Sequence, residues 1–362
     1  MKNYQKLSNY IFISLFSIAL IFFAIAISVF PKKNFSEKEN RPLSEFPTAS
    51  LQNIIEGDFF DRRGDFYSDN FPFRDFFTSV HTVSELSLGK TECNGVIRTF
   101  DNALVVLPSY SYNKTKDSFN SLYQFIDEQN AYFYLAPRTI DAFYSSLPEI
   151  YASDTWNIPL QFIKGDTLDD FFEMTKNSKN LYYKTDHHWT TDGAFFAYNQ
   201  ICERMGIEAY PEKYFQKKSL SDDFLGTSFS KSGLPKSAAS PDTIMLYRYD
   251  SDTDYTIYNY ETKKSSDSFY DFDALGKTDK YRVFMGGNFS HLSIRKNSNS
   301  DREKLLLIKD SYANSVIPFL ALHFDLEVID PRYCTQTYIE DVLTTTECDR
   351  ILILVGVDTV AN

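Results

Sequence analysis

The alternation of apolar runs and amphipathic stretches is clearest toward the end of the chain. Three short apolar runs, at 304–309, 326–330 and 350–357, have the length and composition of buried strands. Amphipathic patterns at 312–324 and 337–346 lie between them and predict helices. This strand-helix alternation predicts parallel strands covered by helices, and therefore an α/β core with helices on both faces of the sheet.

Farther upstream the pattern is less regular but still predicts several elements. Residues 131–136 form a continuous apolar run that ends at a proline, which predicts another buried strand of the same sheet. An amphipathic helix is expected at 117–129 and a strand at 281–285. Residues 211–281 are rich in Ser, Asp and Tyr and hold few helix signals, so they predict an irregular insertion with some β structure.

A polar cluster stands directly before the strongest helix signal. Residues 184–189 read Lys-Thr-Asp-His-His-Trp and contain two of the five histidines and one of the two tryptophans. Thr190, Thr191 and Asp192 all suit an N-cap, apolar positions recur at helical spacing over 194–205, and Gly206 suits the end of a helix. The Asp-His pair is therefore expected on a loop before a helix, where rigid scaffolds commonly present catalytic groups.

The N-terminal segment is the longest uncharged apolar run. Residues 11–30 contain no charge, and about 20 apolar residues span a bilayer as a helix. Lys2 and Lys6 precede the run and favour a cytoplasmic N-terminus. A cleaved signal peptide is the alternative, because residues 24–26, Ala-Ile-Ala, resemble a cleavage site. Since the run continues to Phe30, we expect an uncleaved single-pass anchor in the cell membrane, with the rest of the chain extracellular.

These patterns divide the chain into three parts. They are a cytoplasmic tail with a transmembrane signal anchor at 1–33, a juxtamembrane linker and helical entry segment at 34–99, and an α/β domain at 100–362 that contains the insertion 211–281. The formal net charge of −12 argues against a nucleic-acid partner, which would require a basic surface. The four cysteines lack metal-binding spacing, and no cofactor is expected.

A second polar cluster, Lys-Asp-Ser-Tyr-Ala-Asn-Ser at 309–315, lies between a predicted strand and a predicted helix. Ser311 would there occupy the carboxyl end of a parallel sheet, and the following N–H groups would be able to hold an oxyanion. The same position also suits a residue that only caps the helix. A serine nucleophile needs a base within hydrogen-bond reach and an acid that orients the base. Ser311, His188 and Asp186 supply these three groups.

Two adjacent histidines compete for the role of base. Neighbouring side chains in an extended segment point to opposite faces, so Asp186 and His188 would share a face and His187 would pack or bind on the other. The alternative is a metal site built from Asp186, His187, His188 or Asp192, although two adjacent histidines would be awkward ligands to one ion. The remaining histidines are isolated in the sequence: His81, His291 and His323. We therefore expect a serine, histidine and aspartate group without a metal.

Taken together, these motifs resemble the DHHW protein family. The resemblance rests on Asp-His-His-Trp followed by Thr-x-x-Gly, and on the late Leu-Leu-x-Ile-Lys-Asp-Ser-Tyr-Ala-Asn-Ser. Segments that fit the same pattern over most of 34–362 are Asn-Arg-Pro-Leu at 40–43, Phe-Pro-Phe-Arg-Asp at 71–75, Gly-Gly-Asn at 286–288 and Asp-Pro-Arg-Tyr at 330–333.

The DHHW family is similar to the SGNH-hydrolase-like proteins of alginate O-acetylation, in which an Asp-x-His motif precedes the serine, the reverse of ordinary SGNH hydrolases. The resemblance implies an SGNH-like sheet with a circularly permuted motif order. It also implies Ser311 as nucleophile, His188 as base and Asp186 as the orienting acid.

The chain departs from ordinary SGNH enzymes at the expected oxyanion donor. Those enzymes place Gly-x-Asn-Asp where this chain has Gly-Val-Asp-Thr, at 356–359. Asn288 is one candidate replacement, although a plain turn is the simpler interpretation of its segment. The backbone N–H of Tyr312, acting with one from 330–333, is another. Arg332 is expected either to face an acidic glycan or to pair with an acid.

The resemblance implies an acyltransferase or esterase that acts on O-acetyl groups of a cell-surface polysaccharide through an acyl-serine intermediate. It also implies a membrane-bound O-acyltransferase partner that supplies the acyl group. The alternative is a non-catalytic glycan-binding or assembly component of an envelope complex, which the aromatic content of 17% would suit. A triad with intact geometry favours the enzyme, whereas a base turned away from Ser311 favours the binding protein.

The uninterrupted apolar run at 11–30 predicts that the full-length chain stays in the membrane. Cell fractionation should recover it with the membrane, with residues 34–362 accessible from outside. A soluble exported form that begins near Ile27 would contradict the anchor and support a cleaved signal peptide.

Overall fold

The computed structural model describes residues 2–36, 41–151, 155–298 and 301–361. Asn40, the first residue of the Asn-Arg-Pro-Leu motif, lies outside the described residues. The chain divides into two compact units, an N-terminal unit up to Leu88 and an α/β unit from Gly89 onward. Each unit is described by itself.

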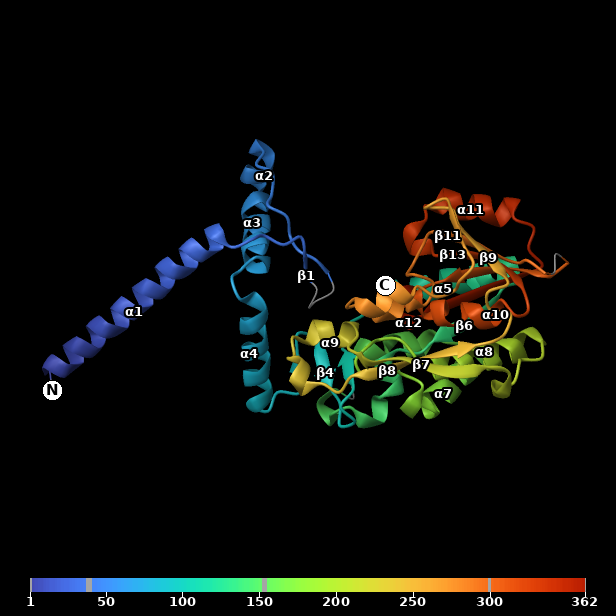
Figure 1. The fold of residues 1–362 in the computed structure, drawn as a ribbon, viewed down its shortest axis with the longest axis horizontal. Helices are drawn as coiled ribbons and strands as arrows, with labels where there is room; N and C mark the ends of the chain where they lie inside the picture. Colours follow the sequence, from blue (N-terminus) through green and yellow to red (C-terminus); the bar gives the residue numbers. More distant parts are fainter. Residues whose placement is uncertain (1, 37–40, 152–154, 299–300, 362) are drawn as a thin grey trace. The chain divides into compact units, whose positions relative to one another are not determined.

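The N-terminal unit is helical. Its first helix, α1 (Lys2–Val29), contains the segment Gln5–Val29, which is long and apolar enough to cross a membrane (Figure 1). This observation confirms the predicted apolar helix and is consistent with a signal anchor or a signal peptide. The other elements of this unit are β1 (Phe35–Ser36), β2 (Arg41–Pro42), α2 (Leu51–Glu56), α3 (Asp58–Asp69) and α4 (Arg74–Ser87).

Asp69 ties the linker of this unit to the end of α3. Its carboxylate accepts hydrogen bonds from the Arg41 side chain, at 2.5 and 3.1 Å, and from the Ser44 N–H at 2.8 Å. The hydrogen bond from Arg41, opposed by partial burial, lowers the pKa of Asp69 well below its usual value. The segment that joins β2 to α2 is therefore fixed to α3 through an ionised side chain.

A seven-stranded sheet forms the centre of the α/β unit, in the order β10-β9-β11-β13-β12-β14-β6. The strands are β6 (Tyr132–Ala136), β9 (Tyr255–Asn259), β10 (Lys264–Ser266), β11 (His291–Lys296), β12 (Lys304–Lys309), β13 (Asp325–Ile329) and β14 (Arg350–Gly356). The strands β13, β12, β14 and β6 are parallel neighbours, whereas β11, β9 and β10 add to β13 as antiparallel strands. The four parallel strands confirm those predicted from the sequence, but the sheet is mixed rather than wholly parallel.

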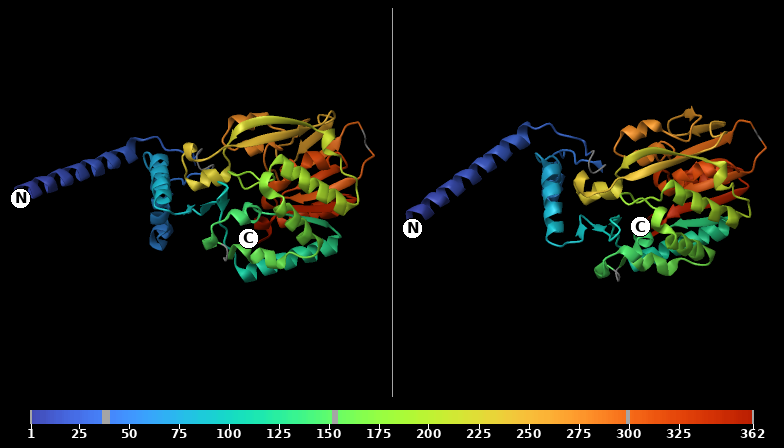
Figure 2. Two further views of the ribbon diagram at one scale, coloured as in Figure 1. Left: turned by 90° about the horizontal axis from the view of Figure 1, so that it is seen from below. Right: turned by 60° about the horizontal axis from the view of Figure 1, so that its bottom comes forward.

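Helices cover both faces of this sheet. Leu305 and Leu307 of β12 face a core that includes α8 (Thr191–Met205). Leu306 and Ile308 face the opposite core, which includes residues of the helices α5 (Tyr112–Gln129), α11 (Gln336–Thr345) and α12 (Val357–Ala361). The late strands lie in the interior of this unit with helices around them (Figure 2). The alternation of side chains along a strand thus accounts for the continuous apolar sequence of β12.

The remaining elements lie around these layers. Two short antiparallel pieces consist of β3 (Glu92–Cys93), β4 (Val96–Arg98) and β5 (Leu104–Val106), and of β7 (Gln216–Phe224) with β8 (Asp242–Arg248). The further helices are α6 (Thr139–Ala142), α7 (Asp166–Lys176), α9 (Thr227–Ser232) and α10 (Ile317–Leu320).

Region 211–281 is more regular than the sequence suggested. Its β7 and β8 pair with each other, while β9 and β10 extend the central sheet. The β structure expected in this region is therefore present, and the strands of its later half are part of the central sheet. The polar and tyrosine-rich composition predicted these strands only weakly, because β7 and the edge strand β10 are largely exposed.

Two predicted elements have a different form. Residues 281–285 are not a strand: Lys280–Val283 is a 3-10 helix, and only Phe284 pairs, with Tyr270. The left-handed backbone of Met285 (φ 63°) and Gly286 (φ 76°) turns the chain away before a strand can continue. The expected helix at 312–324 is a 3-10 helix, Ser311–Ser315, followed by the short α10.

The close packing of α8 predicts the effect of one substitution. A Cβ atom on Gly193 would lie 2.2 Å from the Leu181 carbonyl oxygen, so Gly193→Ala forces backbone apart. We expect a loss of about 1–3 kcal/mol in the free energy of unfolding. Gly276→Ala is the matched control, because its Cβ would meet no atom within 4 Å. Thermal unfolding of the full chain in detergent should separate the two variants, and equal melting temperatures would contradict this packing.

Candidate active site

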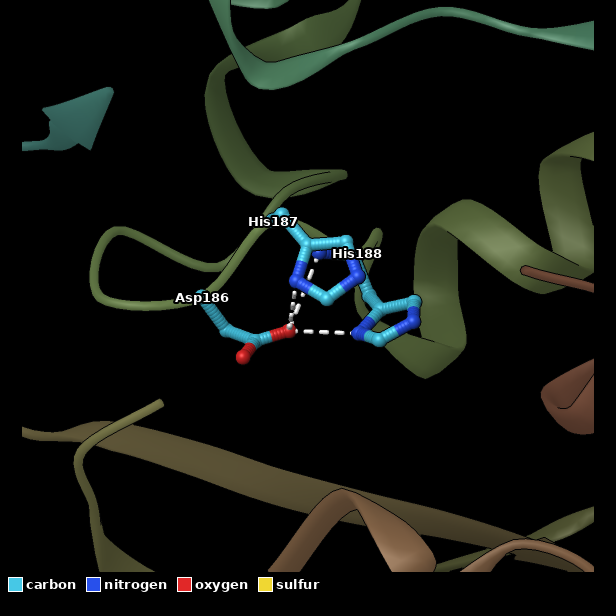
Figure 3. Close-up of side chains that lie close together, drawn as sticks. All are labelled: Asp186, His187 and His188. Carbon is cyan, nitrogen blue, oxygen red and sulfur yellow. Dashed lines mark hydrogen bonds and ion pairs between the residues drawn. The ribbon is translucent and has the colours of Figure 1, made fainter. Parts of the chain in front are cut away.

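A tight loop before α8 presents the three residues 186–188. An isolated antiparallel bridge joins Tyr182 to Trp189, and the Tyr183 N–H donates to the His188 carbonyl oxygen at 3.2 Å. Thr190 then caps α8 by accepting a hydrogen bond from the Gly193 N–H, and Gly206 ends the helix in a left-handed conformation. This arrangement confirms the predicted loop before the helix (Figure 3).

The structure brings Asp186, His188 and Ser311 into one hydrogen-bonded chain. His188 Nε2 lies 2.8 Å from Ser311 Oγ, and His188 Nδ1 lies 2.5 Å from Asp186 Oδ1. Ser311 stands just beyond the carboxyl end of β12, at the start of its 3-10 helix. Both distances are within the reach of a nucleophile, a base and an orienting acid. The geometry agrees with the sequence prediction, and the catalytic roles of the three residues stay a prediction.

Asp186 is held by a second chain segment that the sequence did not reveal. Its Oδ1 accepts the His188 N–H at 3.0 Å, and its Oδ2 accepts the N–H and the hydroxyl of Thr227 at 2.7 and 2.9 Å. A Cβ atom on Gly226 would lie 2.2 Å from the Asp186 Cβ, so the approach requires glycine. The only signal in the sequence was a Gly-Thr pair before a short helix. Nothing in the neighbouring sequence indicated that this pair would contact Asp186.

Two aromatic rings enclose the ring of His188. Tyr281 is stacked on it with centroids 3.7 Å apart and planes 6° from parallel, and the Tyr281 hydroxyl donates to the Ser311 carbonyl oxygen at 3.2 Å. The ring of His187 lies 3.7 Å from His188 at an angle of 40°. Two rings this close to a third must occupy its opposite faces, so His188 is sandwiched between them and buried.

The expectation that His187 leaves the opposite face is therefore wrong. The chain bends through residues 184–188 instead of running extended, so the alternation of a strand does not apply. His187 and His188 both lie beside Asp186, as Figure 3 shows.

The surroundings of the triad shift two pKa values downward. Burial alone would raise the pKa of Asp186, but the adjacent His187 and His188 and the hydrogen bonds from His188 and Thr227 hold it well below its usual range. Burial lowers the pKa of His188 to about 4, and the neighbouring His187 acts in the same direction against Asp186. At neutral pH the acid is ionised and the histidine is neutral, which are the protonation states that a base and its orienting acid require.

A second aspartate positions the loop that carries Ser311. Asp310 Oδ1 accepts the Tyr312 N–H at 2.9 Å, while Oδ2 accepts the Gly356 N–H at 2.7 Å and the Thr359 hydroxyl at 2.6 Å. The Tyr312 N–H donates to Asp310, so the structure gives no support to its expected role as an oxyanion donor. The sequence could not show this, because Asp310 and Ser311 suit the cap of a helix equally well.

Asn288 lies in a polar network behind the serine. Its Oδ1 accepts hydrogen bonds from Lys309 Nζ at 3.0 Å and from Asn314 Nδ2 at 3.0 Å. Lys309 also donates to Asn314 Oδ1 at 2.8 Å and pairs with Asp330 at 3.3 Å. Burial lowers the pKa of Lys309 to about 8, with Asp330 opposing the shift. Asn314 lies one turn of 3-10 helix after Ser311, so the network is adjacent to the serine.

Arg332 is paired with an acid rather than free. Its Nε and one guanidinium nitrogen donate to Asp330 at 2.8 and 2.7 Å, and its own N–H donates to the same carboxylate at 3.2 Å. The Tyr333 N–H is bound to the Asp330 carbonyl oxygen. The N–H groups of Arg332 and Tyr333 are therefore engaged within the loop, so the structure gives no support to their expected role in an oxyanion hole.

The group that could hold a metal ion among the described residues is Asp186, His187 and His188, whose ligand atoms lie within 4.8 Å of one another. Coordination by His188 would require breaking its bond to Asp186 or to Ser311. Asp192 is directed elsewhere, toward Lys217 at 3.2 Å and the Tyr247 hydroxyl. The donor set therefore fits a proton-transfer chain better than a metal centre.

Comparisons with known proteins show similarity in family motif and in fold. The family model described as DHHW protein matches residues 168–329. A DHHW family protein from Eubacterium siraeum has a similar structure, with 22% identity and a TM-score of 0.58 over 75% of this chain and 93% of that one. Bacillus cereus PatB1 is similar with 20% identity and a TM-score of 0.57 over 74% of this chain and 97% of that one. Its structure with a sulfonyl adduct gives 21% identity and a TM-score of 0.56 over the same shares. No curated protein matches the chain.

The burial of His188 predicts how its ring titrates. Its imidazole should stay neutral well below the ordinary histidine pKa of about 6.5 and gain a proton only near pH 4. Imidazole ¹H–¹⁵N spectra over this range, assigned by comparison with His188→Ala, measure this directly. Protonation of His188 at or above the ordinary value would contradict the description of its surroundings.

Proposed function

Because the DHHW protein family model matches residues 168–329, we propose that the chain is an exported, membrane-anchored acyltransferase or esterase. It acts on O-acetyl groups of a cell-surface polysaccharide through an acyl-serine intermediate. The observation that carries this proposal is the continuous hydrogen-bonded chain from Ser311 through His188 to Asp186.

In the first half of the reaction, Ser311 Oγ attacks the carbonyl carbon of an acetyl ester. Its proton passes to His188 Nε2, which lies 2.8 Å away. The tetrahedral intermediate collapses, and the leaving alcohol takes the same proton back from His188. The acetyl group is then bonded to Ser311 and the donor has become an alcohol.

In the second half, a hydroxyl attacks the acetyl-serine. His188 removes the proton of the incoming hydroxyl and returns it to Ser311 Oγ as the bond to serine breaks. A sugar hydroxyl gives an acetylated glycan, and water gives acetate. Asp186 keeps the Nδ1 proton on His188 and stabilises the imidazolium that forms in both halves.

Asn288 is the proposed oxyanion donor. Lys309 and Asn314 both donate to its Oδ1, so the amide oxygen is turned into the network and its NH₂ group faces the other way. Among the described residues this NH₂ group donates no hydrogen bond, so it is available to donate to a developing oxyanion. Asn288 thereby replaces the asparagine that ordinary SGNH enzymes carry after a different strand.

Two further aspects of the proposal follow from α1 and from the family resemblance. The apolar helix Gln5–Val29 would anchor the enzyme with its α/β unit outside the membrane. A membrane-bound O-acyltransferase partner would supply the acyl group. The sulfonyl adduct of Bacillus cereus PatB1 supports a covalent mechanism by analogy, because such an adduct is the product that an activated nucleophile forms.

Substitution at the triad tests the proposal with a small acetyl ester. Ser311→Ala and His188→Ala should each lower kcat/KM by about a thousandfold or more, because they remove the nucleophile and its base. Ser228→Ala is the matched control, since Ser228 is fully buried and its hydroxyl has no hydrogen-bond partner among the described residues. His187→Ala should show a smaller loss than His188→Ala.

Three outcomes would contradict the assignment. An active Ser311→Ala enzyme would exclude the acyl-serine. If the His187→Ala enzyme is inactive and the His188→Ala enzyme has nearly normal activity, the roles of the two histidines would be exchanged. Inhibition by a chelator with both histidine variants active would favour the metal site.

A further inference from the structure

His187 lies beside the triad, and the proposed mechanism gives its side chain no task. Its side chain is 41% exposed, while those of Asp186 and His188 are almost fully buried. Its backbone is fixed, because the Tyr312 hydroxyl donates to the His187 carbonyl oxygen at 2.6 Å. Its ring is held by its tilted contact with the ring of His188 and by the contact of Nδ1 with the Thr227 hydroxyl at 2.6 Å.

The hydrogen bonds of Thr227 determine which nitrogen of His187 carries the proton. The Thr227 hydroxyl has a single proton, and it donates that proton to the ionised Asp186 at 2.9 Å. It must therefore accept a hydrogen bond from His187, so Nδ1 of His187 is the protonated nitrogen. Asp186 Oδ1, 3.7 Å from the same Nδ1, favours the same tautomer. In the neutral ring Nε2 is then an acceptor without a proton.

The free acceptor of His187, like Nε2 of His188, lies on the far side of its ring from Asp186 (Figure 3). In His188 that nitrogen is the one bonded to Ser311. Among the described residues no hydrogen bond to Nε2 of His187 is recorded. An exposed acceptor with a fixed direction therefore lies next to the base.

We propose that Nε2 of His187 binds a second hydroxyl of the acyl acceptor, adjacent to the hydroxyl that attacks the acetyl-serine. The ring centroids of His187 and His188 lie 3.7 Å apart, so neighbouring hydroxyls of one sugar ring can reach both imidazoles. One hydroxyl would meet His188 while its neighbour donates to His187. His187 thus makes the site selective for acceptors with vicinal hydroxyls and favours transfer over hydrolysis. This inference rests on the proposed function.

Two substitutions separate the two nitrogens of His187. His187→Asn keeps an amide near the position of Nδ1, where it can still contact Thr227, but removes the acceptor at Nε2. His187→Gln places an amide oxygen near the position of Nε2 and is the conservative variant that should restore the acceptor. Melting temperatures of both variants show whether either substitution disturbs the fold.

The acceptor pair should differ only in the second hydroxyl. Ethylene glycol carries two neighbouring hydroxyls, and 2-methoxyethanol has one of them blocked by a methyl group. With a small acetyl ester as donor, the measured quantity is the ratio of the two transfer rates, corrected for the two equivalent hydroxyls of the glycol. For the wild-type enzyme we expect a ratio of about three- to tenfold, the effect of one net hydrogen bond.

The ratio should fall to about one in His187→Asn and recover at least in part in His187→Gln, whatever the absolute rates of the variants. A wild-type ratio of one, or a ratio that His187→Asn leaves unchanged, would overturn the inference while acetyl turnover continues. Absence of all ester turnover in the wild-type enzyme would instead overturn the proposed function, and the inference with it.

Discussion

The ionised carboxylate of Asp186 is the feature on which the arrangement of the site depends. A charge that is 1% exposed costs several kcal/mol unless strong hydrogen bonds replace its water. Asp186 receives two donors from His188 and two from Thr227, and these lie in segments about forty residues apart. The segment that carries Thr227 is therefore part of the active site. The glycine before it, Gly226, is required because any larger residue would displace the carboxylate.

A second buried aspartate, Asp310, holds the loop that carries Ser311 in the same way. Asp310 accepts hydrogen bonds from the residue after Ser311 and from the end of β14, so it ties two parallel strands together where the nucleophile is presented. Each loop of the candidate site is thus held by a buried aspartate, one that orients the proposed base, His188, and one that shapes the turn of the proposed nucleophile, Ser311. Tyr281 links the two halves, because its ring covers His188 and its hydroxyl reaches the Ser311 backbone. A site preorganised in this way loses little energy to rearrangement during proton transfer.

Periodicity in the sequence was sufficient for the four parallel strands and for α8 with its caps, because each of these elements is defined by neighbours in the chain. The residues 186, 188 and 311 were also recognisable, since their residue types and their places beside elements suit one reaction. Thr227 and Tyr281 were not recognisable, because their importance comes from contacts with residues remote in sequence. The position of His187 was predicted wrongly for a related reason: a bend closed by the Tyr182–Trp189 bridge replaced the extended backbone that the argument assumed. The oxyanion donors were not predictable, because a candidate N–H group can serve only if no other residue already accepts its proton. The hydrogen bonds that decide this are visible only in the structure.

The central claim is that Ser311 forms a covalent bond with the acyl group. The direct measurement is mass spectrometry of the enzyme quenched in acid shortly after mixing with an activated acetyl ester, followed by peptide mapping. The account predicts one added acetyl group, located on the peptide at Ser311, that accumulates when deacylation is slow and that is absent from Ser311→Ala. An acetyl group on another residue, with Ser311 unmodified, would contradict it. Ester turnover without a trapped acetyl-enzyme, under conditions in which the His188→Ala variant also turns over the ester, would contradict it as well.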